Sequence, residues 1–566
     1  MRKCDLLREK VEYGDFRNLV ETIGEKYADK PAFSYRVNPR DEKSVQKSYT
    51  QLRADVRALG TTLIARGMAG KHIIVIGKQS YPWIVSYFAI LATGSVIVPL
   101  DKDWSKEDLA ATAERADGEF VLVDPEIMEK GTFVAEAIGA PAPIALSLDN
   151  EEGCEALGEL IAGGEARLLE GDKAYFEREV DPDKLSLLVF TSGTTGKGKG
   201  VMLTQTAVMK DLADIIPYID FADKSVNVLP PHHTYGSSVT MLGHASIGIE
   251  SYISSGLRYI LKELELEKPG HLILVPLYLE TFYRKITANV KQQGKEKLVN
   301  TMLGICKFLH LPKFIRRALF KDIHKAFGGE LKMVISGGAA LSQDVVDFFD
   351  GIGITVLNGY GITECAPIVA VNHSKSIVPG SVGYVLDIND VKIDEPNEDG
   401  EGEILVKGPN VMMGYYKDEE NTRDAMTEDG YFRTGDYGKL NKNGALFITG
   451  RKKNLIILSN GKNVYPEEIE AEFIALPGIL EIIVYEGKSK RGGMYDAIVA
   501  EIYPDQDYID KNNITDIKAH LQKFVDDYNK TAVPYKKIGV LKVREEEFPK
   551  NTLRKIMRFK IDMSID

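Results

Sequence analysis

The sequence predicts an α/β protein with two α/β halves, then a region of short antiparallel strands, then a small α+β region at the C-terminal end. From Pro31 to Val123, strand-like apolar runs alternate with helix-like patterns, and such β-α-β alternation predicts a parallel sheet with helices on its faces. From Gly402 onward the apolar runs are short, alternating and punctuated by glycine, which is typical of a small β-barrel or antiparallel sheet. The chain has 566 residues, more than one hydrophobic core usually supports, so we expect two or more domains.

Composition and charge are those of a globular protein and disfavour one class of partner. Hydrophobic residues make up 44% of the chain and charged residues 27%, both ordinary values for a soluble globular protein. The net charge is −12, which repels polyanions. We therefore expect no nucleic-acid partner, and an anionic ligand would need a local basic pocket.

The cysteines and the N-terminal segment favour a cytoplasmic location. The four cysteines show no metal-binding spacing, and in so long a chain they are typical of reduced thiols; they are Cys4, Cys154, Cys306 and Cys365. Met1 to Lys10 is charged and lacks an apolar segment, so it does not have the pattern of a secretory signal.

The expected elements follow from apolar periodicity and from capping residues. Helices are expected at Asp15–Lys26, Tyr49–Gly67 (with Thr50 as its cap), Trp83–Thr93, Thr204–Ile215, Leu277–Lys285 and Ile514–Tyr528. Strands are expected at Pro31–Tyr35, Lys71–Ile76, Ser95–Leu100, Phe120–Val123, Leu187–Phe190, Val226–Pro230, Gly270–Pro276, Gly402–Lys407, Ile482–Glu486 and Ala497–Tyr503. Polar residues interrupt Ile84–Leu100, which favours buried α/β structure over a membrane span. Glu151–Glu179 is acidic and irregular, and we interpret it as a surface connection.

A phosphate-binding loop is predicted at Thr191–Gly200, directly after the apolar run Leu187–Phe190. Four glycines within eight positions allow the backbone to turn tightly, with N–H groups free to point at one anion. Four hydroxyl groups and two lysines, Lys197 and Lys199, add donors and positive charge. A loop of this composition against a buried strand indicates phosphate binding rather than a plain surface connection.

The loop fits one nucleotide-binding pattern only in part and resembles another closely. It matches the Walker pattern as far as Lys199, but Gly200 stands where that pattern needs Ser or Thr. The string TSGTTGKGKG instead resembles T-S-G-T-T-G-x-P-K-G, the signature of the adenylate-forming superfamily of acyl-CoA synthetases, peptide-synthetase adenylation domains and luciferases. Gly198 replaces the family's usual proline, and Gln205 stands where histidine is frequent. The resemblance implies that ATP phosphates contact Thr191, Ser192, Gly193, Thr194, Thr195, Gly196 and Lys199.

Two later segments resemble the family's adenine and magnesium motifs. Ser336–Ala340 has almost no side-chain bulk, so a planar ligand could lie against its backbone; the alternative is a tight packing turn. VLNGYGITECAP, Val356–Pro367, resembles Q-G-Y-G-x-T-E. The resemblance implies an adenine site at Gly337, Gly338, Ala339, Ala340, Asn358, Gly359, Tyr360 and Gly361. It also implies that Thr363 contacts the α-phosphate and that Glu364 and Thr191 hold Mg²⁺, a cation that prefers oxygen ligands.

The resemblance continues into a ribose site and a domain boundary. YFRTGDYGKL contains the family's T-G-D, so Asp436 is expected to accept both ribose hydroxyls; a turn aspartate is the alternative. GRKKNLIILSNGKNVYPEEIE, Gly450–Glu470, implies that Arg451 reaches ribose and phosphate, that Lys453 is the hinge and that Gly461 lines the pantetheine tunnel. The implied domains are 1–452, with two layered α/β subdomains and a small β-barrel, and 453–566, a small mobile α+β domain.

The C-terminal end carries the implied catalytic lysine. FPKNTLRKIMR resembles P-x-T-x-S-G-K-I-x-R, which aligns Lys555 with the family's lysine, while Leu553 and Arg554 replace Ser and Gly. A basic tail is the alternative.

The acyl site is implied by PPHHTYG at Pro230–Gly236. Neighbouring histidines without a nearby carboxylate or cysteine make a poor metal site. The stretch resembles L-P-x-x-H-x-x-G, so His233 would act at the acyl site and the pocket would be lined by Tyr235, Gly236, Ser237 and Met241.

Lys307–Lys325 is basic and amphipathic. Two readings follow: attachment to an anionic membrane surface, or a helix packed on the body with a solvated basic face. Pro312 interrupts the pattern and favours the packed helix.

Taken together, the resemblance implies an AMP-forming ligase similar to long-chain fatty acyl-CoA synthetases. Its substrates would be ATP, a medium- or long-chain fatty acid and CoA, with Mg²⁺ as cofactor. An acyl-carrier protein in place of CoA, an aromatic acid in place of a fatty acid, and a non-catalytic nucleotide-binding or membrane-attached scaffold remain as alternatives.

Overall fold

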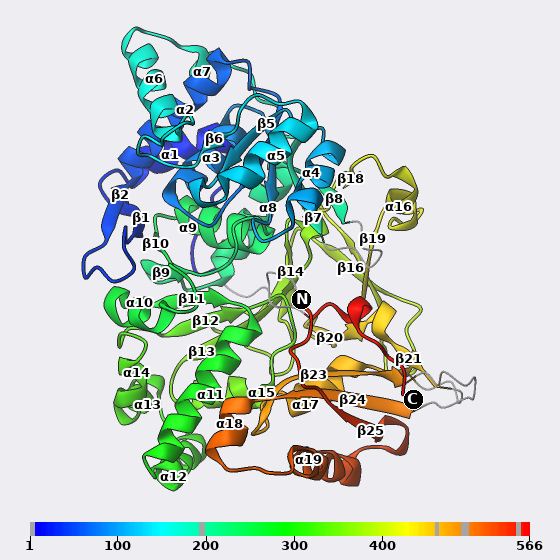
Figure 1. The fold of residues 1–566 in the computed structure, drawn as a ribbon. Coiled ribbons are helices and arrows are strands. Elements are labelled where there is room, and N and C mark those ends of the chain that lie inside the picture. Colours follow the sequence, from blue (N-terminus) through cyan, green and yellow to red (C-terminus); the bar gives the residue numbers. More distant parts are fainter. Residues whose placement is uncertain (1–5, 192–197, 459–462, 488–496, 551–555, 566) are drawn as a thin grey trace.

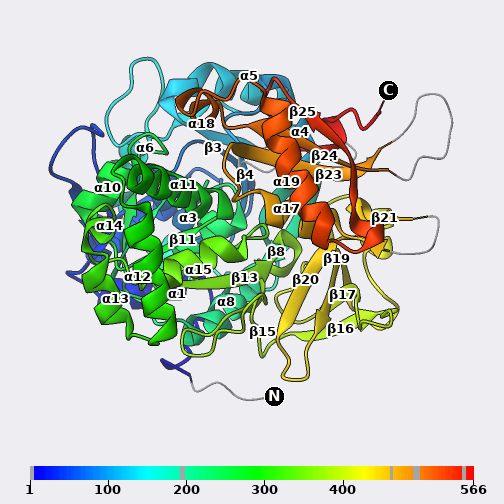
Figure 2. The ribbon, with the colours of Figure 1, turned by 90° about the horizontal axis from the view of Figure 1, so that it is seen from below.

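Two large sheets, of seven and nine strands, form the upper and middle parts of the molecule (Figure 1), and three smaller sheets, of four, two and three strands, belong to the later part of the chain. The computed structural model describes residues 6–191, 198–458, 463–487, 497–550 and 556–565. Seen from below, the last part of the chain packs as a separate layer beside the large sheets (Figure 2).

The first large sheet has seven strands in the order β18-β8-β7-β4-β3-β5-β6. Their bounds are Gly414–Tyr415 (β18), Lys199–Thr204 (β8), Leu185–Thr191 (β7), Val96–Leu100 (β4), His72–Ile76 (β3), Phe120–Val123 (β5) and Ile144–Ala145 (β6). The strands from β7 to β6 pair in parallel, as the β-α-β pattern predicts. β8 pairs antiparallel with β7 and β18, so the predicted phosphate loop joins neighbouring antiparallel strands.

The second large sheet has nine strands in the order β15-β14-β13-β12-β11-β9-β10-β1-β2. Their bounds are Tyr384–Val385, Ile368–Val371, Thr355–Gly361, Met333–Ser336, His271–Leu274, Lys224–Asn227, Glu250–Ile253, Pro31–Tyr35 and Val45–Ser48, in that order. Its central strands are parallel, with antiparallel strands at both edges.

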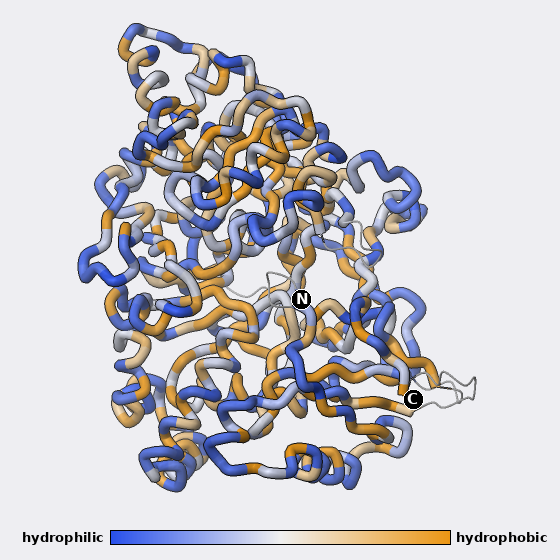
Figure 3. The backbone as a smooth tube through the Cα atoms, viewed as in Figure 1, coloured by the Kyte–Doolittle hydropathy of each residue, from blue (hydrophilic) through white to orange (hydrophobic). Residues whose placement is uncertain are grey.

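Helices between the two large sheets form the main core. They are α1 (Phe16–Lys26), α2 (Tyr49–Ala65), α3 (Tyr81–Ala92) and α8 (Gln205–Ile215). α3 is buried over nearly its whole length, because its sequence is apolar on every side. This burial confirms that Ile84–Leu100 is a core helix and strand. Figure 3 shows the hydrophobic residues concentrated in these inner elements.

Helices also cover the outer faces of the sheets. Over the first sheet lie α4 (Lys106–Arg115) and α5 (Met128–Ile138); around the second lie α10 (Ile260–Glu267), α11 (Pro276–Gln292) and α15 (Gln343–Gly351). The described helices therefore follow the layered α/β pattern that the sequence predicts.

A four-stranded antiparallel sheet follows the large sheets. It has the order β16-β17-β19-β20, with bounds Asp390–Asp394, Gly402–Lys407, Phe432–Leu440 and Leu446–Arg451. The expected antiparallel strands are confirmed. Among the described residues β16 and β20 form no hydrogen-bonded ladder with each other, so this sheet is open. Of the two forms that the sequence allowed, a small barrel or an antiparallel sheet, it takes the second.

The last part of the chain is α+β, as predicted. α17 (Pro466–Phe473) and α19 (Ile517–Thr531) pack on a three-stranded sheet of β23 (Ile479–Gly487), β24 (Ala497–Pro504) and β25 (Ile538–Val543). Arg284 of α11 donates to the carbonyl oxygens of Ile479 and Leu480 at 3.4 and 3.2 Å, so this part contacts the body through α11.

Two local expectations were wrong. Glu151–Glu179 contains two helices, α6 (Leu157–Leu169) and α7 (Ala174–Glu177), rather than an irregular connection. Its acidic residues face solvent, while Leu157, Leu160 and Ile161 reach the core. The cap of α2 is Ser48, whose hydroxyl accepts the N–H of Gln51, and not Thr50.

The basic stretch Lys307–Lys325 is not one helix. It contains the end of α12 (Glu296–Phe308), then α13 (Lys313–Leu319) and α14 (Lys321–Lys325), with Pro312 at the N-cap of α13. Over the ranges that the structure describes, no helix is both long enough and apolar enough to cross a membrane.

Candidate active site

The described ends of the predicted phosphate loop lie against β18. Thr191 ends β7 opposite Lys199 of β8, and its hydroxyl group is 3.5 Å from the Lys199 carbonyl oxygen. The Nζ atom of Lys199 lies 4.6 Å from the centre of the Tyr415 ring, and Arg115 donates to the carbonyl oxygen of Gly198. The other predicted members lie outside the described residues: Ser192, Gly193, Thr194, Thr195 and Gly196.

Beside this loop, Glu364 accepts a 3.0 Å hydrogen bond from the hydroxyl group of Tyr415. Burial raises the pKa of Glu364, although Tyr415 and the charge of Arg451 oppose that shift. Glu364 and Thr363 belong to the short helix η4 (Thr363–Cys365). Tyr415 therefore contacts both Glu364 and Lys199, two of the predicted site residues.

A buried polar contact fixes the backbone just after Glu364. Asp211 of α8 accepts from the Asn410 amide at 3.0 Å and from the Ile368 N–H at 3.3 Å. Asn410 also donates to the carbonyl oxygen of Cys365 at 3.1 Å. Burial raises the pKa of Asp211 well above its usual value. The contact ties α8 and the segment before β18 to η4.

Tyr360, Asp436 and Arg451 come together from three strands. The Tyr360 hydroxyl donates to Asp436 Oδ2 at 2.7 Å, and Arg451 Nε lies 2.8 Å from Asp436 Oδ1. Asp436 and Arg451 are register partners on β19 and β20, while Tyr360 belongs to β13. The Asp436 side chain is only 3% exposed, so both of its oxygens have a partner in a nearly water-free setting.

The glycine-rich segment after β12 lies beside the motif of β13. Ser336 pairs with Asn358, so Gly337 lies next to the following Gly359 and Tyr360. A Cβ atom on Gly337 would lie 3.1 Å from the Tyr235 hydroxyl oxygen, and Gly338 has a φ of +90°. Gly338, Ala339 and Ala340 are exposed. The predicted open strip of backbone is therefore accessible at the end of β12, as Gly361 is at the end of β13.

The predicted acyl residues lie on and just before a π-helix, η3 (Tyr235–Leu242). π-Helical turns are uncommon and are frequent at functional sites. A Cβ atom on Gly236 would lie 2.1 Å from the Pro230 carbonyl oxygen, so this position requires glycine. Ser237 and Met241 are buried.

His233 and His232 are held neutral. Burial lowers the pKa of His233 well below its usual value and that of His232 to about 3. The Nε2 atom of His233 is buried without a hydrogen-bond partner, which leaves it available to a ligand. His232 Nε2 lies 3.7 Å from Asp101. Throughout the described part of the chain, no three His, Cys, Asp or Glu side chains are grouped as metal ligands.

Charged and polar residues near the predicted hinge contact residues of the C-terminal part. Lys453 lies in η5 (Lys452–Asn454), directly after Arg451. Asn454 donates to Glu467 at 2.5 Å. Burial lowers the pKa of Arg451, but the charge of Asp436, with a smaller contribution from Glu467, raises it above its usual value. Arg558 pairs with Glu470. Lys555 and Gly461 lie outside the described residues.

Sequence reasoning missed Tyr415, Asn410 and Glu467. Tyr415 carries no motif of its own. Its pairing with Val201, and the hydrogen bond from the Met412 N–H to the Glu364 carbonyl oxygen, bring it to Glu364. Glu467 lies inside a recognised stretch, yet its partners Asn454 and Arg558 are far apart in sequence.

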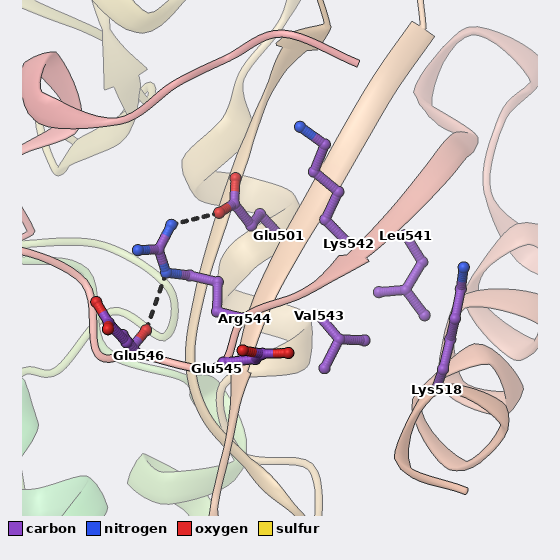
Figure 4. Close-up of a pocket in the computed structure, with 8 residues that line it drawn as sticks. All are labelled: Glu501, Lys518, Leu541, Lys542, Val543, Arg544, Glu545 and Glu546. Atoms are coloured by element: carbon purple, nitrogen blue, oxygen red, sulfur yellow. Dashed lines mark hydrogen bonds and ion pairs between the residues drawn. The ribbon is translucent and has the colours of Figure 1, made fainter. Parts of the chain in front are cut away.

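A groove of about 570 Å³ lies elsewhere, on the C-terminal sheet (Figure 4). It is lined by Glu501, Lys518 and residues 541–546, and Arg544 pairs with Glu501 at 2.5 Å. None of its residues belongs to the predicted site.

These motifs and their assembly agree with comparisons with known proteins. Residues 20–416 match the family of AMP-binding enzymes. The chain therefore belongs to the AMP-binding enzyme family.

Its relatives include ligases of fatty acids. It is 28% identical over 549 residues to the chloroplastic long-chain-fatty-acid–[acyl-carrier-protein] ligase AEE15 of Arabidopsis thaliana, covering 82% of this chain and 74% of that one. It is 29% identical to the long-chain-fatty-acid–CoA ligase FadD15 of Mycobacterium tuberculosis, covering 83% and 80%. Its structure is similar to ATP-bound MatB from Rhodopseudomonas palustris, with a TM-score of 0.74, 25% identity and coverage of 96% and 97%.

Proposed function

We propose that this protein joins a medium- or long-chain fatty acid to CoA in two steps, at the expense of ATP. One observation supports the proposal above all: Asp436 contacts both Tyr360 and Arg451. Glu364 lies beside the phosphate loop, where it contacts Tyr415. The predicted residues among these match the family's nucleotide motifs and come from segments far apart in sequence.

In the first step a carboxylate oxygen attacks the α-phosphorus of ATP. The bond from that phosphorus to the pyrophosphate oxygen breaks, which gives acyl-AMP and pyrophosphate. Negative charge accumulates at the α-phosphate, and preorganised donors there are typically worth about 10²–10³ in rate each. We assign this role to Thr363, Lys199 and the loop N–H groups, with Lys555 supplied by the C-terminal part.

The nucleoside would be held by the three-strand cluster. Asp436 has two acceptor oxygens and suits the two ribose hydroxyl groups. The Tyr360 ring and the exposed backbone of Gly338, Ala339 and Ala340 would border adenine, with Gly337, Asn358, Gly359 and Gly361 beneath them. Arg451 would reach from the ribose toward the phosphates.

Mg²⁺ suits the donors present. Glu364 and Thr191 offer a carboxylate and a hydroxyl group, and Mg²⁺ usually takes few protein oxygens and keeps water and phosphate oxygens as its other ligands. When bound, it would neutralise phosphate charge, while Tyr415 orients the Glu364 carboxylate.

In the second step the thiol sulfur of CoA attacks the acyl carbonyl carbon, the bond to AMP breaks and AMP leaves. The acyl chain would lie along Tyr235, Gly236, Ser237 and Met241. His233, neutral and with a buried unpaired nitrogen, would accept a hydrogen bond from the thiol, and the thiol proton would pass to solvent as the sulfur attacks. Gly461 would line the route of the pantetheine arm.

We further propose that the chain divides at Lys453. Residues 1–452 would contain two α/β subdomains and the four-stranded sheet, and 453–566 would rotate between the two steps. Support comes from the position of Lys453 directly after Arg451 and from the separate core of the C-terminal part. The protein would act in the cytoplasm.

An acyl-carrier protein is the second candidate acceptor, because one relative is named as a ligase for that acceptor. Release of pyrophosphate on mixing the protein with ATP and fatty acids tests the proposal. Release that depends on the fatty acid is expected, and a non-catalytic nucleotide-binding protein would release none.

A further inference from the structure

The outer side of α12 and α13 exposes an unusual group of apolar side chains. Phe308 is 82% exposed and Phe314 is 72% exposed. We define the α12–α13 surface as these two residues with Leu298, Ile305, Leu309 and Leu319, all of which are at least 46% exposed. Figures 1 and 2 both place these helices at the outside of the molecule.

The packing of α12 does not account for this surface. Another stripe of the same helix, Val299, Met302, Leu303 and Cys306, already packs on the core of the second sheet. α13 has no buried residue at all. The two helices thus present a second apolar face, and no other described element buries it. Several large apolar side chains exposed on two neighbouring helices are typical of an interaction site.

The charge around this surface is opposite to that of the chain. Residues 295–325 contain eight basic and two acidic side chains, whereas the whole chain has a net charge of −12. Asp350 of α15 neutralises part of this positive charge, because it forms ion pairs with Arg316 at 3.0 Å and with Lys313 at 3.2 Å. Lys295, Lys297 and Lys321 are exposed around the apolar side chains.

We propose that the α12–α13 surface docks the protein on a membrane that contains anionic lipids. Phe308, Leu309 and Phe314 would enter the boundary between headgroups and acyl chains, and the lysines would lie among the lipid phosphates. A fluid lipid surface accepts exposed side chains without a matching pocket, which favours it over a protein partner.

Vesicle binding tests the proposal. The intact protein is sedimented with vesicles of phosphatidylcholine and phosphatidylglycerol, or of phosphatidylcholine alone, at low and high salt. We expect binding to the anionic vesicles that weakens with salt, because screening acts on the lysines. Phe308→Ser with Phe314→Ser should reduce partitioning about tenfold or more, since two aromatic side chains lose their burial in lipid.

Matched variants distinguish binding through the α12–α13 surface from nonspecific binding of exposed apolar or basic side chains to vesicles. Leu169 is 89% exposed and Val37 is 78% exposed, and both lie elsewhere, so Leu169→Ser with Val37→Ser should leave binding unchanged. Lys297→Glu with Lys321→Glu should lower binding to anionic vesicles, whereas Lys442→Glu, in an exposed turn of the four-stranded sheet, should not. Equal losses in surface and control variants, or no binding to anionic vesicles, would overturn the proposal.

If a serine variant does not fold, tryptophan fluorescence provides a second test of the proposal. Phe308→Trp should show a blue shift of emission on anionic vesicles, and Leu169→Trp should not. An unshifted Phe308→Trp spectrum with bound vesicles would contradict the proposed geometry. Binding of an acidic carrier protein, with no binding to vesicles, would assign the surface to a protein partner and also overturn the proposal.

Discussion

The hydroxyl group of Tyr360 donates a 2.7 Å hydrogen bond to Asp436 and so joins the nine-stranded sheet to the four-stranded sheet. Arg451 holds the other carboxylate oxygen at 2.8 Å. Asp436 is therefore an organising residue as well as a proposed ribose ligand, and the two roles can be tested separately.

Tyr360→Phe tests the structural role. The ring remains, while a buried hydrogen bond to a charged group is lost, so we expect a loss of about 2 kcal/mol in the free energy of unfolding. ATP affinity should change little, because the face of the ring is kept. Urea unfolding and ATP titration measure the two effects, and a large loss of ATP affinity with unchanged stability would contradict this account.

Asp436→Ala tests the ribose role. We expect ATP to bind at least about tenfold more weakly, because two charge-assisted hydrogen bonds are lost, while fatty-acid binding stays nearly the same. Asp390→Ala is the matched control, since Tyr431 donates to Asp390 on the same sheet away from the site. ATP affinity equal to that of the wild type would remove Asp436 from the ribose site.

Glu280 gives a prediction about pH. Burial raises its pKa to about 7, with Arg284 opposing. Below pH 4.5 the carboxyl group is neutral in both the folded and the unfolded state; as the pH rises through about 7, the folded state must bury a carboxylate and loses stability. Glu280→Gln should thus stabilise the protein by about 2–3 kcal/mol at pH 8.5 and change little at pH 4.5.

Thermal or urea unfolding at the two pH values checks that difference. Glu296→Gln, in exposed sequence at the start of α12, serves as the control and should show no such pH dependence. A gain for Glu280→Gln that is the same at both pH values would contradict the assigned cause.

Arg558 tests how the C-terminal end is fastened. It pairs with Glu470 and donates to the Val484 carbonyl oxygen at 2.7 Å. Arg558→Met removes the charged partner of the largely buried Glu470 carboxylate, which keeps the Val484 N–H as a donor, so we expect a loss of about 2 kcal/mol in the free energy of unfolding. Adding Glu470→Met should restore much of the loss. A double variant no more stable than the single one would show that the pair does not act as a unit.

Lys555→Ala tests the proposed rotation of the C-terminal part. We expect adenylate formation to be nearly abolished and thioester formation from preformed acyl-AMP to persist. The two half-reactions are measured separately on the same preparation. Comparable loss in both would exclude a lysine that serves only the first step.

Much of the site could be predicted from the sequence because its members lie in compact motifs. A motif of a few residues predicts the roles of Thr363 and Glu364, and another predicts the role of Asp436. The contacts that bring these residues to Arg451 and Tyr415 could not be predicted in that way. Register on β19 and β20 sets Arg451 opposite Asp436, and the pairing of β8 with β18 brings Tyr415 to Glu364. Such contacts depend on strand order, which spacing does not encode.

The fold, too, could be predicted in some parts and not in others. Core strands such as Phe120–Val123 have the predicted bounds because they are apolar throughout. The helix Leu157–Leu169 was missed because glycines and charges surround its few core residues. Gly164 packs so closely that a Cβ atom would lie 1.8 Å from the Ala58 carbonyl oxygen, a role in helix packing that composition does not reveal.

The central claim is that a fatty acid is adenylated here and then passed to a thiol. ATP–pyrophosphate exchange against acetate, fatty acids of increasing length, benzoate, cinnamate and amino acids, each repeated with CoA and with an acyl-carrier protein, tests it most directly. We predict exchange with medium- or long-chain fatty acids that becomes net thioester formation with CoA. Exchange only with aromatic or amino acids, or no exchange with any acid, would contradict the account.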